Sequence, residues 1–192
     1  MYTIDFEAGI MSNEKDALND ILPTKLNKVV KAGESASNAL IQRWFGTNAL
    51  PEGSKHKDFD LRRKKMTQYL TSQCQKIIFV KKTYGRIVDS AEVEQGDFAQ
   101  VISTCFPNDS DGVPEFVPSG LRVYVLGTGF IDQDENERFN TVAHEISHRV
   151  LGTTDYWYGK QDSLDKATAN HANVIDCAEN WGYFYQELME NS

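Results

Sequence analysis

The pentapeptide His144-Glu145-Ile146-Ser147-His148 contains two histidines four residues apart. On an α-helix, positions four apart lie on one face, so both imidazoles can reach a single metal ion. Imidazole nitrogens suit zinc, and a catalytic zinc has three protein ligands and an open position for water. Glu145 lies beside that position and can take a proton from the water. The pattern predicts one catalytic Zn²⁺ with His144 and His148 as ligands and Glu145 as the general base.

A long amphipathic helix is expected to carry these residues. It begins near Asp134 and ends before Gly152, a residue typical of helix C-terminal caps. One apolar stripe runs along it, formed by Phe139, Val142, Ala143, Ile146 and Val150. This stripe makes the helix at least half buried, and buried histidines need polar partners. Zinc-bound imidazoles normally donate their second N–H to a carboxylate or carbonyl, and Asp176 and Glu179 are candidates for that role.

The residues after this helix extend the motif as Gly152-Thr153-x-Asp155-x-x-Tyr158-Gly159. His-Glu-x-x-His followed closely by Gly-Thr-x-Asp-x-x-Tyr-Gly resembles the aspzincin metalloendopeptidases, the family that contains deuterolysin and the fungal peptidyl-Lys metalloendopeptidases. The resemblance implies that Asp155 is the third zinc ligand and that Tyr158 helps to bind the transition state. It also implies an α+β, zincin-like fold that is mostly helical, with a small mixed β-sheet and an active-site helix carrying the His-Glu-x-x-His motif.

The position of Asp155 agrees with this role, since a glycine turn after a capped helix can bring its carboxylate to the same ion. The alternative is that Asp155 is only a turn residue. A second alternative makes Glu179 the third ligand. In a third, the chain is a catalytically inactive zinc-binding interaction module. A purely structural site is usually closed by four protein ligands, and Cys177 or His171 would have to supply the fourth.

The resemblance reaches beyond the metal motifs. Arg43-Trp44-Phe45-Gly46 resembles the family's Trp-Phe-Gly after its first helices, and residues 173–180 resemble its downstream helix rich in Asn and Asp. In the Lys-specific members, two acidic residues on that helix receive the substrate lysine. The nearest match here is Asn173 and Asp176, in which an amide replaces one acid. These two residues are therefore the candidate substrate-binding pair.

The sequence predicts a single peptidase domain over residues 1–192. Residues 1–46 are expected to form its N-terminal helical part, and a second helix is expected over 59–75. Residues 77–126 predict a small sheet, because short segments rich in β-branched and aromatic residues alternate with Gly, Asp, Asn and Pro. Residues 134–192 hold the zinc-site helices. The predicted strands are 77–80, 100–102 and 121–126, and the last helix is predicted over 163–189.

The overall charge argues against nucleic-acid binding, since the formal net charge is −8 and phosphate contacts need a basic surface. The expected partner is a protein or peptide substrate. The one basic run, residues 62–65, is interpreted as a solvated helix face.

Three cysteines, Cys74, Cys105 and Cys177, cannot all pair within the chain, so buried thiols are expected, with one disulfide plus one thiol as the alternative.

Asp5 and Glu7 lie where a signal peptide needs a positive flank and an apolar stretch, so no classical signal peptide is expected. The expected location is cytoplasmic, or outside the cell after export by a specialised secretion system. No segment approaches the roughly 18 apolar residues of a membrane helix, so membrane insertion is not expected.

Resemblance to small bacterial aspzincin-like proteins implies a secreted effector or toxin, with an inhibitor or immunity protein as a further partner. An intracellular processing peptidase is the alternative.

Overall fold

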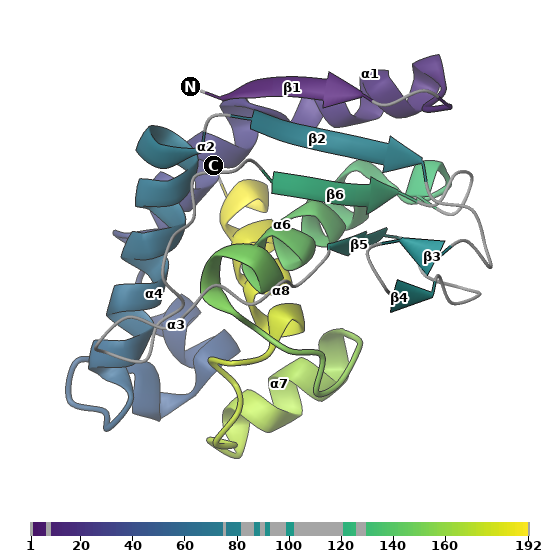
Figure 1. The fold of residues 1–192 in the computed structure, drawn as a ribbon. Helices are drawn as coiled ribbons and strands as arrows, with labels where there is room; N and C mark the ends of the chain where they lie inside the picture. Colours follow the sequence, from purple (N-terminus) through teal and green to yellow (C-terminus); the bar gives the residue numbers. More distant parts are fainter. Residues whose placement is uncertain are drawn as a thin grey trace.

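The computed structural model describes residues 2–6, 9–74, 76–81, 87–88, 91–92, 99–101, 121–125 and 130–191. In this part of the chain, helices predominate and a small sheet covers one side of them (Figure 1). Residues 102–120, within the region predicted to form the small sheet, lie outside the described residues.

The main sheet has the strand order β1-β2-β6-β5, in which β1, β2 and β6 are parallel and β5 is antiparallel to β6. Ile77 and Phe79 of β2 are fully buried, and the Phe79 ring stacks on Phe6 of β1 with centroids 5.8 Å apart. A mixed sheet is therefore confirmed, and a separate antiparallel pair joins β3 to β4. The strands are β1 (Thr3–Phe6), β2 (Lys76–Lys81), β3 (Ile87–Val88), β4 (Ala91–Glu92), β5 (Ala99–Val101) and β6 (Leu121–Val125).

Strand β1 corrects the prediction of a wholly helical N-terminal part. It contributes to the sheet by pairing Ile4 with Ile77 and Phe6 with Phe79, so the sheet joins two segments more than 70 residues apart. The helices that follow β1 agree with the predicted 3.6-residue spacing of apolar side chains. They are α1 (Ser12–Ile21), α2 (Thr24–Gly33), α3 (Asn38–Phe45) and α4 (His56–Gln68), with a 3₁₀ turn η1 (Thr47–Ala49) before α4 and a π-turn η2 (Tyr69–Gln73) after it.

The C-terminal part holds α6 (Glu135–Leu151), α7 (Lys160–Thr168) and α8 (Ala178–Glu190). The prediction of one continuous helix over 163–189 is wrong. Helix α7 ends before Asn170, whose φ of 51° is left-handed, and the chain turns before α8 begins. Residues 171–177 therefore form a turn segment, and this break has consequences for the candidate site.

Helix α6 lies beneath the sheet and packs mainly against α8, while α7 lies at the end of the molecule far from the sheet (Figure 1). The N-terminus of α6 has a capping box. The Asp134 carboxylate accepts from the Glu137 backbone N–H, and the Glu137 carboxylate accepts from the Asp134 backbone N–H. Its C-terminus is capped by Gly152, which has a φ of 66° in the left-handed region. The predicted boundaries of this helix are confirmed.

The core is rich in aromatic rings where α3, α4 and α8 meet. Phe45, Phe59 and Trp181 lie with ring centroids 4.7 to 5.5 Å apart, and each is fully buried.

Cys74 and Cys177 are buried thiols and not disulfide sulfurs, as expected, while Cys105 lies outside the described residues. None of the helices in the described ranges has the length and hydrophobicity needed to span a bilayer.

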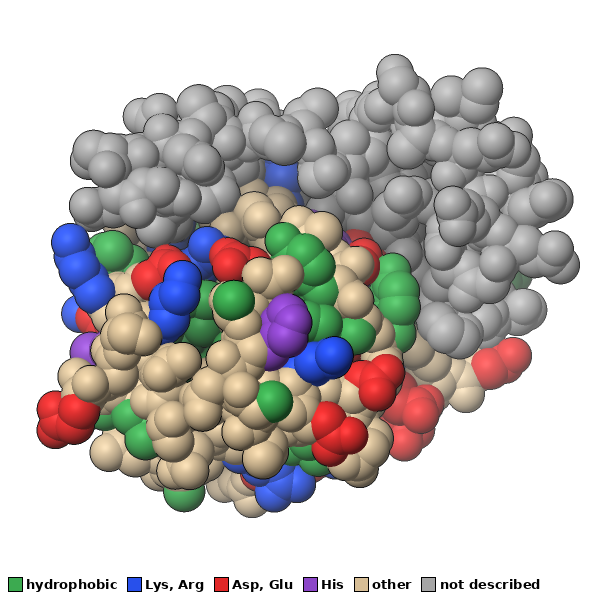
Figure 2. All heavy atoms as spheres, turned by 90° about the horizontal axis from the view of Figure 1, so that it is seen from below, with side chains coloured by type: hydrophobic (Ala, Val, Ile, Leu, Met, Phe, Trp, Pro, Cys, Tyr) green, Lys and Arg blue, Asp and Glu red, His purple; other side chains and the backbone are tan. Residues whose placement is uncertain are grey.

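The surface at the end that carries α7 has acidic and basic side chains interspersed over its described part (Figure 2). Lys166, on α7, lies over the ring of Trp157 with its nitrogen 5.9 Å from the centroid. The prediction that the basic run over 62–65 is solvated is wrong for Arg62, which is only 7% exposed. Its guanidinium group is buried because oxygen acceptors from distant segments surround it.

Candidate metal centre

Three side chains predicted as metal ligands come together at the C-terminal half of α6. The Nε2 atoms of His144 and His148 lie 3.1 Å apart. The Oδ1 atom of Asp155 lies 3.1 Å from His144 Nε2 and 3.2 Å from His148 Nε2. The three candidate ligand atoms therefore form a nearly equilateral triangle.

This triangle fits a small tetrahedral cation. With bonds of about 2.0–2.1 Å, the ligands of a tetrahedral zinc lie about 3.3 Å from one another. Two imidazoles and a carboxylate are also a ligand set that zinc favours. Within the described residues, these three are the one group of His, Cys, Asp or Glu side chains close enough to share an ion, so no fourth described side chain of these types closes the site.

His144 is fixed from behind by Glu179 at the start of α8. The imidazole Nδ1–H donates to Glu179 Oε2 at 2.9 Å, which leaves Nε2 directed at the triangle. The other oxygen, Glu179 Oε1, accepts from the backbone N–H of Gly159 at 2.7 Å. Glu179 thus contacts the nitrogen opposite the candidate metal position, so it supports a ligand and is not the third ligand itself. The sequence-based expectation of Glu179 as a partner for a histidine is confirmed.

His148 is fixed by the segment that follows α6. Its Nδ1–H donates to the Thr153 carbonyl oxygen at 2.8 Å. The Thr153 hydroxyl lies 2.8 Å from the Ser147 hydroxyl, which in turn donates to the His144 carbonyl oxygen at 2.7 Å. Sequence reasoning assigned no role to Ser147 or Thr153, although hydroxyl residues beside a capped helix end are a usual source of such contacts.

The segment after Gly152 is held against the start of α8, and this fixes Asp155. Thr154 donates its N–H to the Asp176 carbonyl oxygen at 2.8 Å, and its own carbonyl accepts from Ala178 at 3.2 Å. Two residues past Asp155, the Trp157 indole N–H donates to Asn180 Oδ1 at 2.9 Å. Asp155 therefore lies between two anchored points, which limits how far its carboxylate can move from the histidines.

The side chains of the triangle also shift one another's pKa values. Burial alone would lower the pKa of His144, but hydrogen bonds to Asp155 and Glu179 and the charge of Glu145 raise it to about 10. Burial disfavours ionised Asp155, but the two histidines hold the pKa of its carboxyl well below its usual range. These directions show strong attraction between the imidazoles and the carboxylate. A metal ion that binds here competes with protons for the same atoms.

Glu145, the predicted general base, is 6% exposed on the buried face of α6. Its charge raises the pKa of both His144 and His148. Tyr158 is 66% exposed, and its neighbour Gly159 is the residue held by Glu179. Tyr158 is therefore on the surface of the same loop as Asp155. The next residue, Gly159, is linked to His144 through Glu179.

The candidate substrate pair, Asn173 and Asp176, lies in the turn before α8 and not on a helix as predicted. Asp176 Oδ1 accepts from Arg62 Nη2 at 2.7 Å, so its carboxylate is already paired with a buried cation. Because Asn173 is neutral, the two residues do not form the doubly charged acidic site that lysine recognition would use. The pairing of Asp176 with Arg62 and the neutral side chain of Asn173 give no support to a preference for lysine.

The two residues considered as a fourth ligand lie apart from the triangle. The Cys177 thiol is 3.9 Å from the Trp157 carbonyl oxygen, and burial raises the pKa of that thiol. His171 packs its ring edge-on against Trp157 and accepts the N–H of Asn173 at 3.2 Å. Neither joins the group of three, so among the described residues the closed structural site has no fourth ligand of this kind.

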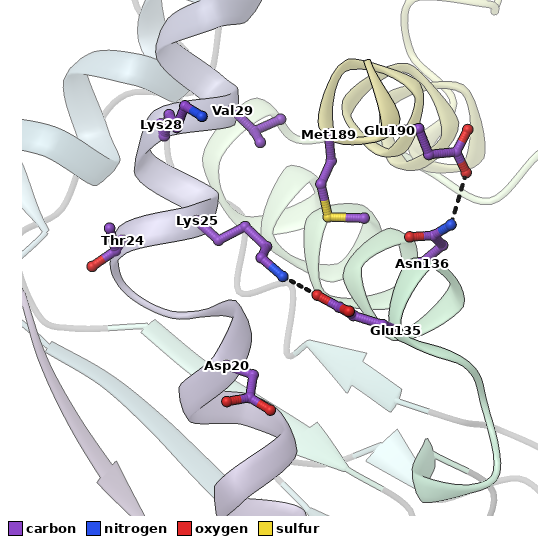
Figure 3. Close-up of a pocket in the computed structure, with 9 residues that line it drawn as sticks. All are labelled: Asp20, Thr24, Lys25, Lys28, Val29, Glu135, Asn136, Met189 and Glu190. Atoms are coloured by element: carbon purple, nitrogen blue, oxygen red, sulfur yellow. Dashed lines mark hydrogen bonds and ion pairs between the residues drawn. The ribbon is translucent and has the colours of Figure 1, made fainter. Parts of the chain in front are cut away.

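A pocket of about 650 Å³ lies at the other end of α6, between α2 and the end of α8 (Figure 3). Lys25 pairs there with Glu135, and Asn136 donates to Glu190 at 3.2 Å. Glu135 precedes His144 by nine residues, which is roughly 14 Å along a helix. This hollow is therefore separate from the candidate metal centre.

Comparisons with known proteins identify the fold. No protein-family model and no curated protein matches the chain. Among solved structures, the chain is similar to a zinc peptidase from Grifola frondosa, with a TM-score of 0.62 and 23% identity, over 93% of this chain and 97% of that chain. The described helices and mixed sheet therefore have the fold of that zinc peptidase.

Proposed function

We propose that this chain is a zinc-dependent endopeptidase of the aspzincin type, with Zn²⁺ held by His144, His148 and Asp155. The observation that carries the proposal is the triangle of ligand atoms 3.1 to 3.2 Å apart, with buried Glu145 directly after His144 on α6. Similarity to a zinc peptidase fold supports the same conclusion. A protein or peptide is accordingly the proposed substrate.

Glu145 is the proposed general base and acid. A zinc ion at this site would polarise the scissile carbonyl and lower the pKa of a water molecule to about 7. Glu145 accepts the proton of the attacking water and returns it to the leaving amine. Its burial and the effect of its charge on both imidazoles support this role, because a buried carboxylate is protected from bulk solvent.

Tyr158 is the proposed oxyanion donor. Its exposure leaves the phenol accessible to a substrate. The hydrogen bond from the Gly159 backbone N–H to Glu179 holds the loop of Tyr158 beside His144. A hydroxyl that donates to the developing negative charge stabilises a transition state by roughly 3 kcal/mol in other enzymes. Tyr158→Phe should therefore lower kcat more than it changes KM.

The test is hydrolysis of a denatured protein, with and without a chelator, by the wild type and by Glu145→Gln. The expected result is cleavage that the chelator abolishes, and a Glu145→Gln protein that binds zinc stoichiometrically but loses about 10²–10⁴-fold in turnover. Glu135→Gln, at the solvent-exposed start of the same helix, is the matched control and should cleave normally. Stoichiometric zinc without cleavage in the wild type would instead favour the inactive zinc-binding interaction module.

The biological setting stays a prediction. An exported effector or toxin and an intracellular processing peptidase both use the proposed chemistry. Toxicity on expression that disappears in Glu145→Gln would favour the effector, and an inhibitor or immunity protein would then be sought among co-purifying chains. Peptide products of the digest would identify the residue preference, for which the paired Asp176 gives no reason to expect lysine.

A further inference from the structure

Arg62 of α4 contacts three separate parts of the chain through one buried guanidinium group. Its Nε donates to Asp58 at 2.9 Å, its Nη1 to the Leu151 carbonyl oxygen at 3.0 Å and its Nη2 to Asp176 Oδ1 at 2.7 Å. The side chain is 8% exposed. Only the planar guanidinium of arginine presents donors to several fixed acceptors in this way, because the single nitrogen of a lysine cannot occupy these positions together.

The two distant contacts are with Leu151, where the segment that carries Asp155 begins, and with Asp176, which is hydrogen-bonded to that segment. Leu151 is the last residue of α6, and its carbonyl oxygen is one of those that a helix end leaves without a helical partner. Asp176 lies just before α8, and its backbone carbonyl accepts from Thr154, the neighbour of Asp155. Arg62 therefore connects the helix of the two histidines to the residue pair that anchors the third ligand.

This arrangement fixes the histidines relative to the carboxylate. Gly152 follows Leu151 with a left-handed φ of 66°, so a small displacement at the end of α6 would redirect the chain leading to Asp155. A shift of Asp176 would move Thr154 through their 2.8 Å hydrogen bond. Both displacements are opposed by the same buried cation.

We propose that Arg62 is a positioning residue for the metal centre, which sets zinc affinity by holding Leu151 and Asp176 so that Asp155 meets His144 and His148. The inference rests on the proposed metal site, but it does not depend on peptidase activity. Arg62 acts on the ligands indirectly, through the Leu151 carbonyl at the end of α6 and through Asp176, whose backbone carbonyl accepts from Thr154.

The test compares Arg62→Lys with Arg63→Lys in the full chain. Arg63 is the adjacent residue on α4 and uses its guanidinium in a similar way, donating to Asp60 and to the carbonyls of Gly33 and Glu34. Those partners lie in α2, in the residue after it and in α4 itself, away from the triangle. Both substitutions remove several guanidinium hydrogen bonds. Only Arg62→Lys affects residues that contact the segment around Asp155.

Zinc affinity is measured by competition with a chromophoric chelator, and ligand geometry by the visible absorption of the cobalt-loaded protein. Arg62→Lys should weaken zinc binding about tenfold and alter the cobalt spectrum. Arg63→Lys should lower the melting temperature but keep zinc affinity within about twofold of the wild type and leave the cobalt spectrum unchanged.

Asp176→Asn provides an independent variant should Arg62→Lys fold poorly. It should weaken zinc binding in the same direction, and the double variant should lose less than the product of the two single effects, since both remove one interaction. Wild-type affinity and an unchanged cobalt spectrum in Arg62→Lys and Asp176→Asn, with wild-type protein that binds zinc, would overturn this inference alone. A wild-type protein that binds neither zinc nor cobalt would overturn the metal centre with it.

Discussion

Glu179→Gln is the sharpest test of how the metal centre is supported. The carboxylate accepts two hydrogen bonds, from His144 Nδ1 at 2.9 Å and from the Gly159 N–H at 2.7 Å, and its side chain is 11% exposed. Glutamine has the same shape but one acceptor oxygen, so it must give up one of these contacts and the charge. Hydrogen bonds to a charged group contribute about 1.5–3 kcal/mol.

The expected loss in zinc affinity follows from that contact. Loss of such a partner behind a metal-bound imidazole weakens metal binding about 10–100-fold, which is about 1.4–2.7 kcal/mol. The two ranges agree, so Glu179→Gln should fall within them when zinc is titrated against a competing chelator at fixed pH.

The matched control is Glu187→Gln on the same helix. Glu187 accepts from the Trp44 indole at 2.9 Å and from Arg43 at 3.2 Å, and its side chain is 20% exposed. This variant should lose stability while keeping zinc affinity within about twofold of the wild type. If Glu179→Gln also stays within that limit, or if both variants lose affinity equally, the proposed support of His144 is wrong.

Three further predictions concern the ligand set and its frame. Asp155→Ala should fold but lose stoichiometric zinc by metal analysis, and retained stoichiometric zinc would refute its role as a ligand. Gly152→Ala should lower the free energy of unfolding by about 1–2 kcal/mol in urea titrations, because a residue with a side chain is strained at a φ of 66°; no change would contradict the left-handed cap. Zinc at about a thousand times its Kd should stabilise the native state by about 4 kcal/mol and raise the melting temperature by about 10 °C, whereas a chelator should reverse this and an unchanged melting curve would argue against binding to the folded chain.

The sequence predicts α6 well because every signal for this helix is local. Asp134 and Glu137 cap its start, apolar residues recur at helical spacing along its length, and Gly152 ends it. The histidines and Asp155 follow from motifs within the same short stretch. Their meeting in one triangle of atoms could therefore be expected from the sequence alone.

Features that depend on distant segments are not predictable in this way. Strand β1 has four half-exposed or exposed residues and gains its place only by pairing with β2, far along the chain. The break before α8 is stabilised by the bridge between Thr154 and Cys177, a tertiary contact that helical spacing does not encode. The burial of Arg62 is equally hidden, because its partners Leu151 and Asp176 lie 89 and 114 residues later.

The most direct test of the metal centre is a crystal structure of the zinc-loaded protein with anomalous data at the zinc edge. One anomalous peak is expected about 2.0–2.2 Å from His144 Nε2, His148 Nε2 and an Asp155 carboxylate oxygen, with the remaining position open to water. A peak elsewhere, an Asp155 side chain turned away from the ion, or a fourth protein ligand in the open position would contradict the proposed centre.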